Sequence, residues 1–254
     1  MTTPNPLQVA KEAARATGTL LRSHFGKPPA VATFYAHDIK LELDVQAQDL
    51  ITKHLLGAFP DHALYGEEGL AGNQESLWEW IVDPIDGTVN FFYGIPHFCV
   101  SIALRHEGVL QLGVIYDPMC DELWEVERGG IPLLNGQPIR VSTRTQLSDA
   151  ILAVGFAKSS STIKAGLPLL AHYVQRARKC RLMGSAALDV AYVACGRLDG
   201  YVESSISLWD IAAGQLLVEQ AGGTFVLTPH PNTPDKFSAI ASSGLIPLSF
   251  DPAE

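Results

Sequence analysis

The sequence has few basic residues and no segment suited to a membrane. Its 18 Lys and Arg stand against 27 Asp and Glu, which gives a net charge of -9. Nucleic acid is therefore not an expected partner, because clusters of Lys and Arg hold phosphate backbones. No apolar run approaches the roughly 20 residues that span a bilayer, and the first residues lack the basic and apolar regions of a signal peptide. We predict a cytoplasmic protein that has no membrane partner.

Cysteine is scarce and widely spaced. No two of the 4 cysteines form a Cys-x-x-Cys pair, since they are Cys99, Cys120, Cys180 and Cys195. This spacing excludes a zinc or redox motif of the usual kind. We interpret all four as buried thiols that pack as small hydrophobic side chains.

The composition indicates a globular chain with a sizeable core. Of the 254 residues, 47% are hydrophobic and 18% are charged, which is not the composition of a disordered protein. Such a length suits one large domain or two closely joined halves. The polar stretch 142–148 predicts the junction between an N-terminal half, residues 1–147, and a C-terminal half, residues 148–254, within one compact unit.

Apolar periodicity predicts an alternation of helices and strands. Helical spacing occurs over 10–21, 44–59, 167–177, 186–195 and 211–220. Strands are predicted over 80–82, 151–154, 179–182, 201–202 and 224–227, with an antiparallel sheet between 98 and 126. Asn135-Gly136 is a strong turn signal.

The segment from Trp80 to Thr88 carries the clearest chemical signal. Asp83 and Asp86 stand three residues apart in a predicted tight turn after a buried strand, with Pro84 fixing one φ angle and Gly87 releasing the backbone. The two carboxylates and the carbonyl of Ile85 are hard oxygen ligands of the kind that Mg²⁺ prefers. The alternative is a segment that binds no metal. Asp-Gly is also common in hairpin turns, and aspartates often cap helices.

Further acidic positions lie at the ends of predicted elements. Glu67 and Glu68 follow a short apolar run, Asp210 lies at the start of a predicted helix, and Asp44 begins another. Acidic residues at such ends exceed what helix capping requires, and loops of this kind carry function. These positions favour the metal-site interpretation.

With these motifs, the chain resembles the inositol monophosphatase-like, magnesium-dependent, lithium-sensitive phosphatases. The resemblance covers nearly the whole chain, and it rests on Gly66-Glu67-Glu68, on Asp83 to Phe91, on Pro96-His97-Phe98 with Val100-Ser101-Ile102, on Trp209 to Gly214, and on Glu219 to Gly223. It implies an α+β fold, the layered α/β/α/β/α sandwich of the inositol monophosphatase and fructose-1,6-bisphosphatase type. It also implies that the N-terminal half carries most metal ligands and that the C-terminal half completes the active site.

The resemblance implies a phosphomonoesterase that uses Mg²⁺, roughly two or three ions per site, and a metal-activated water. Water is the expected nucleophile, because no Asp-x-Asp start indicates a phosphoenzyme. The residues that match the family's metal ligands are Glu67, Asp83, Ile85 through its carbonyl, Asp86 and Asp210. Glu67 and Thr88, whose hydroxyl pairs with an acidic residue, are expected to position and deprotonate the water. Glu68 is left out, because the family uses the first glutamate of the pair.

The acidic partner of Thr88 is expected to be Asp44. When the chain is matched to the family back from Glu67 without gaps, the family's partner aspartate falls on Asp44. The apolar register of the predicted helix agrees, whereas the competing Asp49 lies more than one turn inside that helix. The segment from Asp38 to Asp44 departs from the family, because Leu41 stands where relatives carry threonine. The family's lysine is also missing from its usual position, so only Lys40 or Lys27 is near enough to compensate.

Substrate contacts are expected at both ends of the phosphate ester. The amides of Gly87 and Thr88 suit the phosphate, since they stand at a turn and helix start. The resemblance implies that the alcohol meets Gly184, Ser185, Ala186 and Glu203, with Asp210 also contacting substrate. By residue type alone, Glu203 has the alternative of an ordinary surface carboxylate.

The Glu203 match favours a small polyol phosphate, most of all myo-inositol 1-phosphate. Fructose 1,6-bisphosphate, 3'-phosphoadenosine 5'-phosphate and histidinol phosphate are alternatives, although a bisphosphate would need a basic pocket. Such a pocket could come from the cluster Arg176, Arg178, Lys179 and Arg181, for which a solvated face is the favoured interpretation. A non-catalytic metal-dependent binding or regulatory module is the alternative of another class. The resemblance also implies a homodimer, but no sequence stripe identifies an interface.

Overall fold

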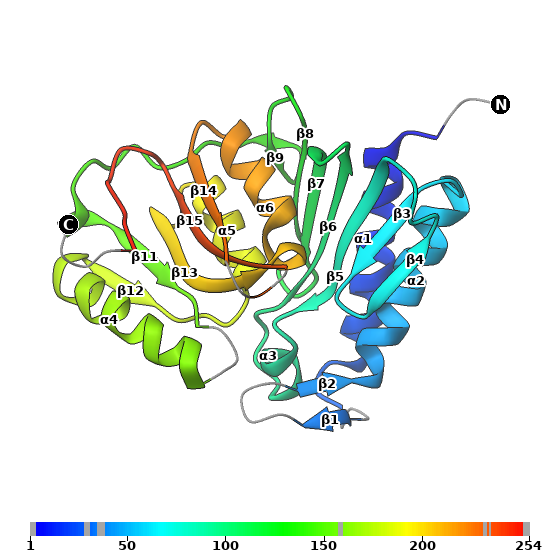
Figure 1. The fold of residues 1–254 in the computed structure, drawn as a ribbon, viewed down its shortest axis with the longest axis horizontal. Coiled ribbons are helices and arrows are strands. Elements are labelled where there is room, and N and C mark those ends of the chain that lie inside the picture. Colours follow the sequence, from blue (N-terminus) through cyan, green and yellow to red (C-terminus); the bar gives the residue numbers. More distant parts are fainter. Residues whose placement is uncertain are drawn as a thin grey trace.

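Helices and sheets alternate in layers across the molecule (Figure 1). The computed structural model describes residues 4–27, 31–34, 39–156, 160–230, 233 and 235–250. The outer helices on one side are α1 (Pro6–His24) and α2 (Glu42–Ala58), which pack on an eight-stranded sheet. Helices α5 (Ala186–Ala194) and α6 (Leu208–Gln220) lie between that sheet and a five-stranded sheet, whose other face is covered by α4 (Ser160–Arg176). The predicted α+β layered sandwich is confirmed.

The larger sheet is built from the first part of the chain. Its strand order is β10-β9-β8-β7-β6-β5-β3-β4, and only the β3 and β5 pair is parallel. The strands are β3 (Ala63–Gly66), β4 (Gly69–Gly72), β5 (Trp78–Asp86), β6 (Cys99–His106), β7 (Val109–Asp117), β8 (Glu122–Glu127), β9 (Leu133–Leu134) and β10 (Gln137–Pro138). The antiparallel sheet expected between 98 and 126 is confirmed. Helices cover both faces, so its central strands are buried on both sides.

The smaller sheet comes from the later part of the chain and has the order β12-β11-β13-β15-β14. Its strands are β11 (Ile151–Val154), β12 (Lys179–Arg181), β13 (Gly200–Ser207), β14 (Thr224–Pro229) and β15 (Lys236–Ser242). Strand β15 is not among the predicted strands, because serines and alanines give its segment a weak strand signal. The larger sheet ends at Pro138 and the smaller one begins at Ile151, while the division at 147 stays a prediction.

The predicted helices are present, with one boundary corrected. Helix α1 begins after Asn5, whose side chain accepts a bond of 2.9 Å from the backbone N–H of Gln8. Helix α4 begins at Ser160 and not near 167, and it continues through Pro168. Proline at that position is typical of a first helical turn, which explains the error. Among the described residues, no helix is both long and apolar enough to cross a membrane.

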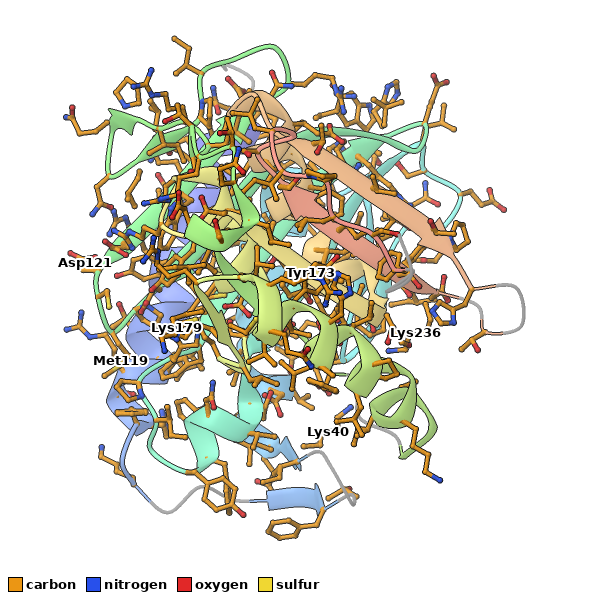
Figure 2. The ribbon with its side chains drawn as sticks, turned by 90° about the vertical axis from the view of Figure 1, so that its left-hand side faces the viewer. Lys40, Met119, Asp121, Tyr173, Lys179 and Lys236 are labelled. Atoms are coloured by element: carbon orange, nitrogen blue, oxygen red, sulfur yellow. The ribbon has the colours of Figure 1, made fainter. Side chains whose placement is uncertain are left out.

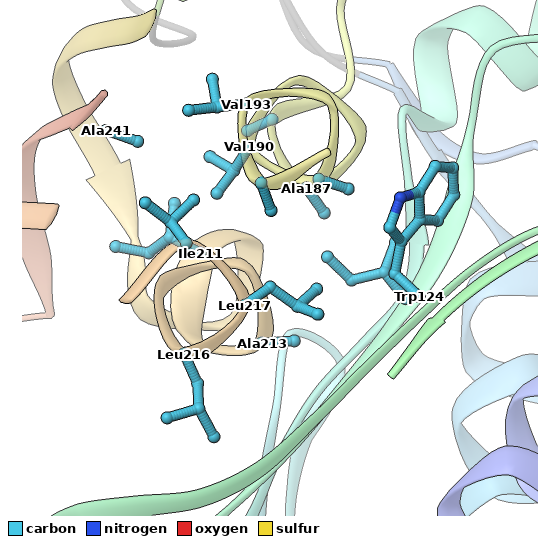
Figure 3. Close-up of a cluster of buried hydrophobic side chains, with 14 of the residues drawn as sticks. Trp124, Ala187, Val190, Val193, Ile211, Ala213, Leu216, Leu217 and Ala241 are labelled. Atoms are coloured by element: carbon cyan, nitrogen blue, oxygen red, sulfur yellow. The ribbon is translucent and has the colours of Figure 1, made fainter. Parts of the chain in front are cut away.

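Helices α5 and α6 form the apolar centre of the molecule (Figure 3). Their close approach depends on two glycines. A Cβ on Gly214 of α6 would lie 2.5 Å from Cγ1 of Val190 on α5, and a Cβ on Gly113 of β7 would lie 2.6 Å from the carbonyl oxygen of Ala213. Each fully buried large aliphatic side chain contributes about 1.5 to 3 kcal/mol. This packing fixes α6, whose N-terminal end carries Asp210.

Three short elements lie beside the site. Strands β1 (Val31–Phe34) and β2 (Ile39–Leu41) pair antiparallel and precede α2. Helix α3 (Thr88–Phe92) follows β5 directly, with Gly87 as its N-cap at φ 98°. That left-handed conformation is one that glycine adopts without strain.

Candidate active site

Strand β5 carries the two aspartates of the central motif. The strand continues to Asp86, so the predicted tight turn after residue 82 is wrong. Its pairing with β6 instead shifts register between Asp83 and Asp86, which is a bulge at Pro84 and Ile85. Proline lacks the N–H that a regular ladder needs, which accounts for the irregularity. Asp83 is 1% exposed and Asp86 is 7% exposed, so both carboxylates are buried.

Three carboxylates from distant parts of the chain converge. Oxygen atoms of Glu67, Asp83 and Asp210 all lie within 4.8 Å of one another. Glu67 follows β3, Asp83 lies on β5, and Asp210 lies in the first turn of α6. Asp210 is oriented by the N–H of Ser207, which donates to its Oδ2 at 3.0 Å. The structure therefore brings together three of the predicted metal ligands from both halves of the chain.

Asp86 lies beside this group and is oriented by the second half of the chain. The Ser185 hydroxyl donates to its Oδ2 at 2.6 Å, and the N–H of Ala187 donates to the same oxygen at 2.7 Å. Ser185 is 1% exposed. Ser185 lines the cleft, as expected of a substrate contact, but its hydroxyl is bonded to Asp86. The sequence analysis does not identify Ala187, because a backbone donor leaves no signal in residue type.

The burial and crowding of these carboxylates disfavour their ionised forms. Burial, followed by the nearby Glu67 carboxylate, raises the pKa of Asp83 well above its ordinary range. Burial and then Asp210 raise the pKa of Asp86 to about 7, against the donation from Ser185, which lowers it. Like charges in a low-dielectric site require protons or cations. The group thus has the donor chemistry and the electrostatic need for a hard cation.

The turn that carries Glu67 is held by Gln48 of α2. The Gln48 side chain accepts from the N–H of Glu68 at 2.9 Å and donates to the carbonyl of Gly69 at 3.1 Å. A Cβ on Gly66 would lie 2.0 Å from Oε1 of Gln48, so glycine is needed there. Gln48 is a positioning residue that the sequence analysis misses. It lies four residues after Asp44, at a spacing that places both on one helix face.

Asp44 and Thr88 occupy positions beside the group. Asp44 is 3% exposed and its Oδ2 accepts from the N–H of Leu41 at 2.7 Å, whereas Asp49 lies on the exposed face of α2. The Thr88 hydroxyl donates to the carbonyl of Ile85 at 2.9 Å. This donation differs from the expected pairing of Thr88 with an acidic residue. Because the single hydroxyl proton is used there, the Thr88 oxygen can only accept from a further partner.

A cleft of about 780 Å³ opens over these carboxylates. Its lining includes all the predicted substrate-contact residues, namely Gly87, Thr88, Gly184, Ser185, Ala186, Glu203 and Asp210. Glu203 is 5% exposed and accepts from the Tyr201 hydroxyl at 2.5 Å. Burial raises the pKa of Glu203 to about 8. The alternative of an ordinary surface carboxylate is therefore wrong.

Basic side chains are rare around the cleft. Of the described residues that line it, Lys236 is the only lysine or arginine, and its ammonium donates to the Ser207 hydroxyl at 2.6 Å (Figure 2). The arginines and lysine between 176 and 181 are not among the lining residues. Arg178 instead pairs with Asp149 at 2.5 Å on an exposed surface. The solvated-face interpretation of that cluster is confirmed.

Cys99 and Arg105 stand at the Cys-x5-Arg spacing of thiol phosphatases. Both lie on strand β6 and not on a phosphate-binding loop. Cys99 is fully buried, and burial raises its thiol pKa well above the usual range. The predicted burial of all four cysteines is wrong for Cys120, which is exposed. Arg105 forms an ion pair with Glu79. This pair therefore lacks the exposed thiolate that such chemistry requires.

Comparisons with known proteins agree with this arrangement. The sequence model of the inositol monophosphatase family matches residues 5–248. A protein named Nus factor SuhB from Xylella fastidiosa is 41% identical over 221 residues, which cover 85% of this chain and 80% of the relative. An inositol-1-monophosphatase from Mesorhizobium japonicum is also 41% identical, over 85% of this chain and 83% of the relative. The crystal structure of extragenic suppressor protein suhB from Bartonella henselae superposes with a TM-score of 0.86 at 35% identity, covering 94% of this chain and 93% of that one.

Proposed function

Since the chain belongs to the inositol monophosphatase family, we propose that it is a Mg²⁺-dependent phosphatase of small polyol phosphates, with myo-inositol 1-phosphate as the leading substrate. The family is a phosphatase family that is generally metal-dependent. The observation that carries the proposal is the convergence of Glu67, Asp83 and Asp210 at the floor of the cleft. Carboxylate oxygens from three elements would hold a hard divalent cation.

The residues fit that cation on electrostatic grounds. Asp83 and Asp86 are buried beside Glu67 and Asp210, and burial raises the pKa of both. A protein with a net charge of -9 would repel an anionic ester unless cations inverted the local field. We assign Glu67, Asp83, Asp86, Asp210 and the carbonyl of Ile85 as the ligands. When bound, Mg²⁺ would act as a Lewis acid on the phosphate and lower the pKa of a water towards neutrality.

The chain's own groups would orient the reactants. The Thr88 oxygen, whose proton is donated to Ile85, would accept a hydrogen from the attacking water. Glu67 would take the other proton of that water as general base. Asp44 would be the acidic residue beside Thr88 and Glu67. The amides of Gly87 and Thr88 would donate to the phosphate oxygens. The water oxygen would then bond to phosphorus as the ester P–O bond on the opposite side breaks, and the leaving alkoxide would take a proton from solvent to depart as the alcohol.

The lining of the cleft around Glu203 favours a neutral polyol over a bisphosphate. Glu203 accepts a hydrogen bond from Tyr201, and Tyr201 and Ser205 also line the cleft. Lys236 is the single lysine or arginine among the described residues that line the cleft, and it already donates to Ser207. A second phosphate would want several cations, whereas hydroxyl groups suit a carboxylate acceptor. These contacts support inositol 1-phosphate and weigh against fructose 1,6-bisphosphate and 3'-phosphoadenosine 5'-phosphate.

A non-catalytic role is the competing function. Relatives named Nus factor SuhB and relatives named inositol-1-monophosphatase match equally well, at 41% identity, so these names do not decide. The complete set of Glu67, Asp83, Asp86, Thr88 and Asp210 supports catalysis, since a non-catalytic relative has no chemical need to retain all of them. Homodimerisation remains a prediction, which light scattering after size-exclusion chromatography would test.

The test is phosphate release from inositol 1-phosphate, fructose 1,6-bisphosphate, 3'-phosphoadenosine 5'-phosphate and histidinol phosphate. Each substrate is assayed with Mg²⁺ and again with a chelator. A chelator-sensitive preference for inositol 1-phosphate is expected. A preference for another ester would replace the substrate and keep the chemistry. Activity on none of them, with Mg²⁺ shown to bind, would move the assignment to a phosphate ester outside this panel or to the non-catalytic role.

A further inference from the structure

Glu68, the second glutamate of the Gly66-Glu67-Glu68 motif, is buried next to the metal-site carboxylates. Its side chain is only 4% exposed. The Gln48 side chain bonds to the main chain of Glu68 and of Gly69, so the backbone that carries Glu68 is held in place. A buried carboxylate is costly unless a cation compensates it. The fold must therefore supply a cation at this point or recruit one from solution.

Lys40 supplies that cation. Its Nζ lies 2.5 Å from Oε2 of Glu68, and it comes from β2, directly before α2 (Figure 2). The field of Lys40 extends further than Glu68, because Glu67 and Asp44 also interact with its charge. One ammonium group thus compensates one buried carboxylate and faces two residues assigned to catalysis. Lys40 lies in the segment that departs from the family's pattern.

We propose that Lys40 is a positioning residue that takes Glu68 out of metal coordination and leaves Glu67 as the metal ligand of the pair. The argument rests on the proposed metal site. The adjacent carboxylates of Glu67 and Glu68, both of which interact with the charge of Lys40, would otherwise attract an additional divalent cation. The ammonium group of Lys40 takes the place of that additional cation and supplies the positive charge from the chain itself. The Lys40–Glu68 pair therefore sets how many cations the site binds.

The experiment counts Mn²⁺ bound per chain, without substrate, by electron paramagnetic resonance of the free ion at about pH 8. The variants are Lys40→Met, Glu68→Gln and the double variant. Lys40→Met keeps the aliphatic stem, and it should bind one additional, weaker Mn²⁺ because Glu68 has lost its cation. The double variant should return to the number bound by the unchanged protein. Lys53→Met is the matched control, since Lys53 is exposed on α2.

Glu68→Gln supplies a second test that needs no extra site. It leaves the Lys40 charge uncompensated beside Glu67 and Asp44, so Mn²⁺ affinity should fall about three-fold to ten-fold. Adding Lys40→Met should restore it. The Mn²⁺ affinity of Glu68→Gln tests the proposal even if Lys40→Met alone fails to fold, which circular dichroism would show.

The outcomes separate this inference from the function proposed above. Failure of the unchanged protein to bind Mn²⁺ would overturn the metal site and the inference together. Normal binding by that protein, with an unchanged number in Lys40→Met and an unchanged affinity in Glu68→Gln, would overturn the inference alone. Protonation of Glu68 in Lys40→Met in place of Mn²⁺ binding would also count against it.

Discussion

Removing divalent cations should make the protein less stable as the pH rises, and Asp86 provides the measure. Its pKa in the folded chain is raised from 3.8 to about 7. One pKa unit corresponds to 1.36 kcal/mol, so ionised Asp86 costs the folded state at most about 4 kcal/mol. The folded state binds the proton more tightly than the unfolded chain does. Stability is therefore unaffected below the unfolded pKa and falls by about 1.4 kcal/mol per pH unit up to the folded pKa.

The assay is urea unfolding, followed by tryptophan fluorescence, at about pH 5.5 and about pH 8 with a chelator. His62 and His97 act in the opposite direction, because burial lowers the pKa of both. The comparison with Asp86→Asn removes their contribution, since that variant keeps both histidines and an acceptor oxygen for Ser185. The variant should gain on the parent by about 2 kcal/mol between the two pH values, because only about 1.5 pH units of the assayed range lie below the folded pKa of Asp86.

With Mg²⁺ added, the parent should be more stable than Asp86→Asn. The parent gains the free energy of Mg²⁺ binding, which the variant has lost together with the Asp86 ligand. A difference between parent and variant that stays constant from about pH 5.5 to about pH 8 in chelator would refute the reasoning. It would mean that Asp86 is ionised in the folded protein without a cation.

Three further substitutions address separate parts of the site. Asp83→Asn should lower phosphate release by about a thousand-fold or more while circular dichroism stays unchanged, and near-normal turnover would contradict the metal-ligand assignment. Ser185→Ala removes the 2.6 Å donation to Asp86, a bond to a charged group worth about 1.5 to 3 kcal/mol, so calorimetry should show Mg²⁺ affinity lowered about ten-fold. Gly155→Ala places a Cβ 1.8 Å from Oε2 of Glu203. The KM for inositol 1-phosphate should therefore rise about ten-fold while Mg²⁺ affinity stays unchanged. Equal losses of substrate binding and Mg²⁺ binding would indicate general unfolding.

Local sequence patterns predict most of the elements and the acidic positions, whereas the layered arrangement is predicted only through the family resemblance. Helical and strand periodicity place most elements, and Glu67, Asp83 and Asp210 stand out as acids at element ends. The structure then shows what sequence patterns cannot show. Ala187 acts through its backbone N–H, and Gln48 acts through a side chain that has many innocuous uses. Such contacts depend on tertiary distances, which a single sequence does not contain.

The errors arise where the backbone departs from regular structure. The segment Asp83 to Asp86 has the residues of a turn, yet the sheet continues through it by accepting a bulge. The family resemblance predicts a carboxylate partner for Thr88, yet its hydroxyl donates to the carbonyl of Ile85, which lies in the same bulge. One irregularity therefore accounts for both differences. Bulges re-aim side chains beside active sites, and here the bulge separates Asp83 from Asp86 in the ladder while keeping both carboxylates buried.

The distribution of ligands between the halves links catalysis to the packing of α6. Asp210 reaches Asp83 only because Gly113 and Gly214 let α6 approach β7 and α5 closely. Gly214→Ala should therefore displace the helix and the carboxylate together, since its Cβ would lie 2.5 Å from Val190. We expect a loss of stability of about 1 to 3 kcal/mol, as in other overpacked cores, together with weaker Mg²⁺ binding. Val190→Ala in the same chain should relieve the contact and restore Mg²⁺ affinity even if some stability stays lost. Affinity that remains normal in Gly214→Ala alone would show that the position of Asp210 does not depend on this packing.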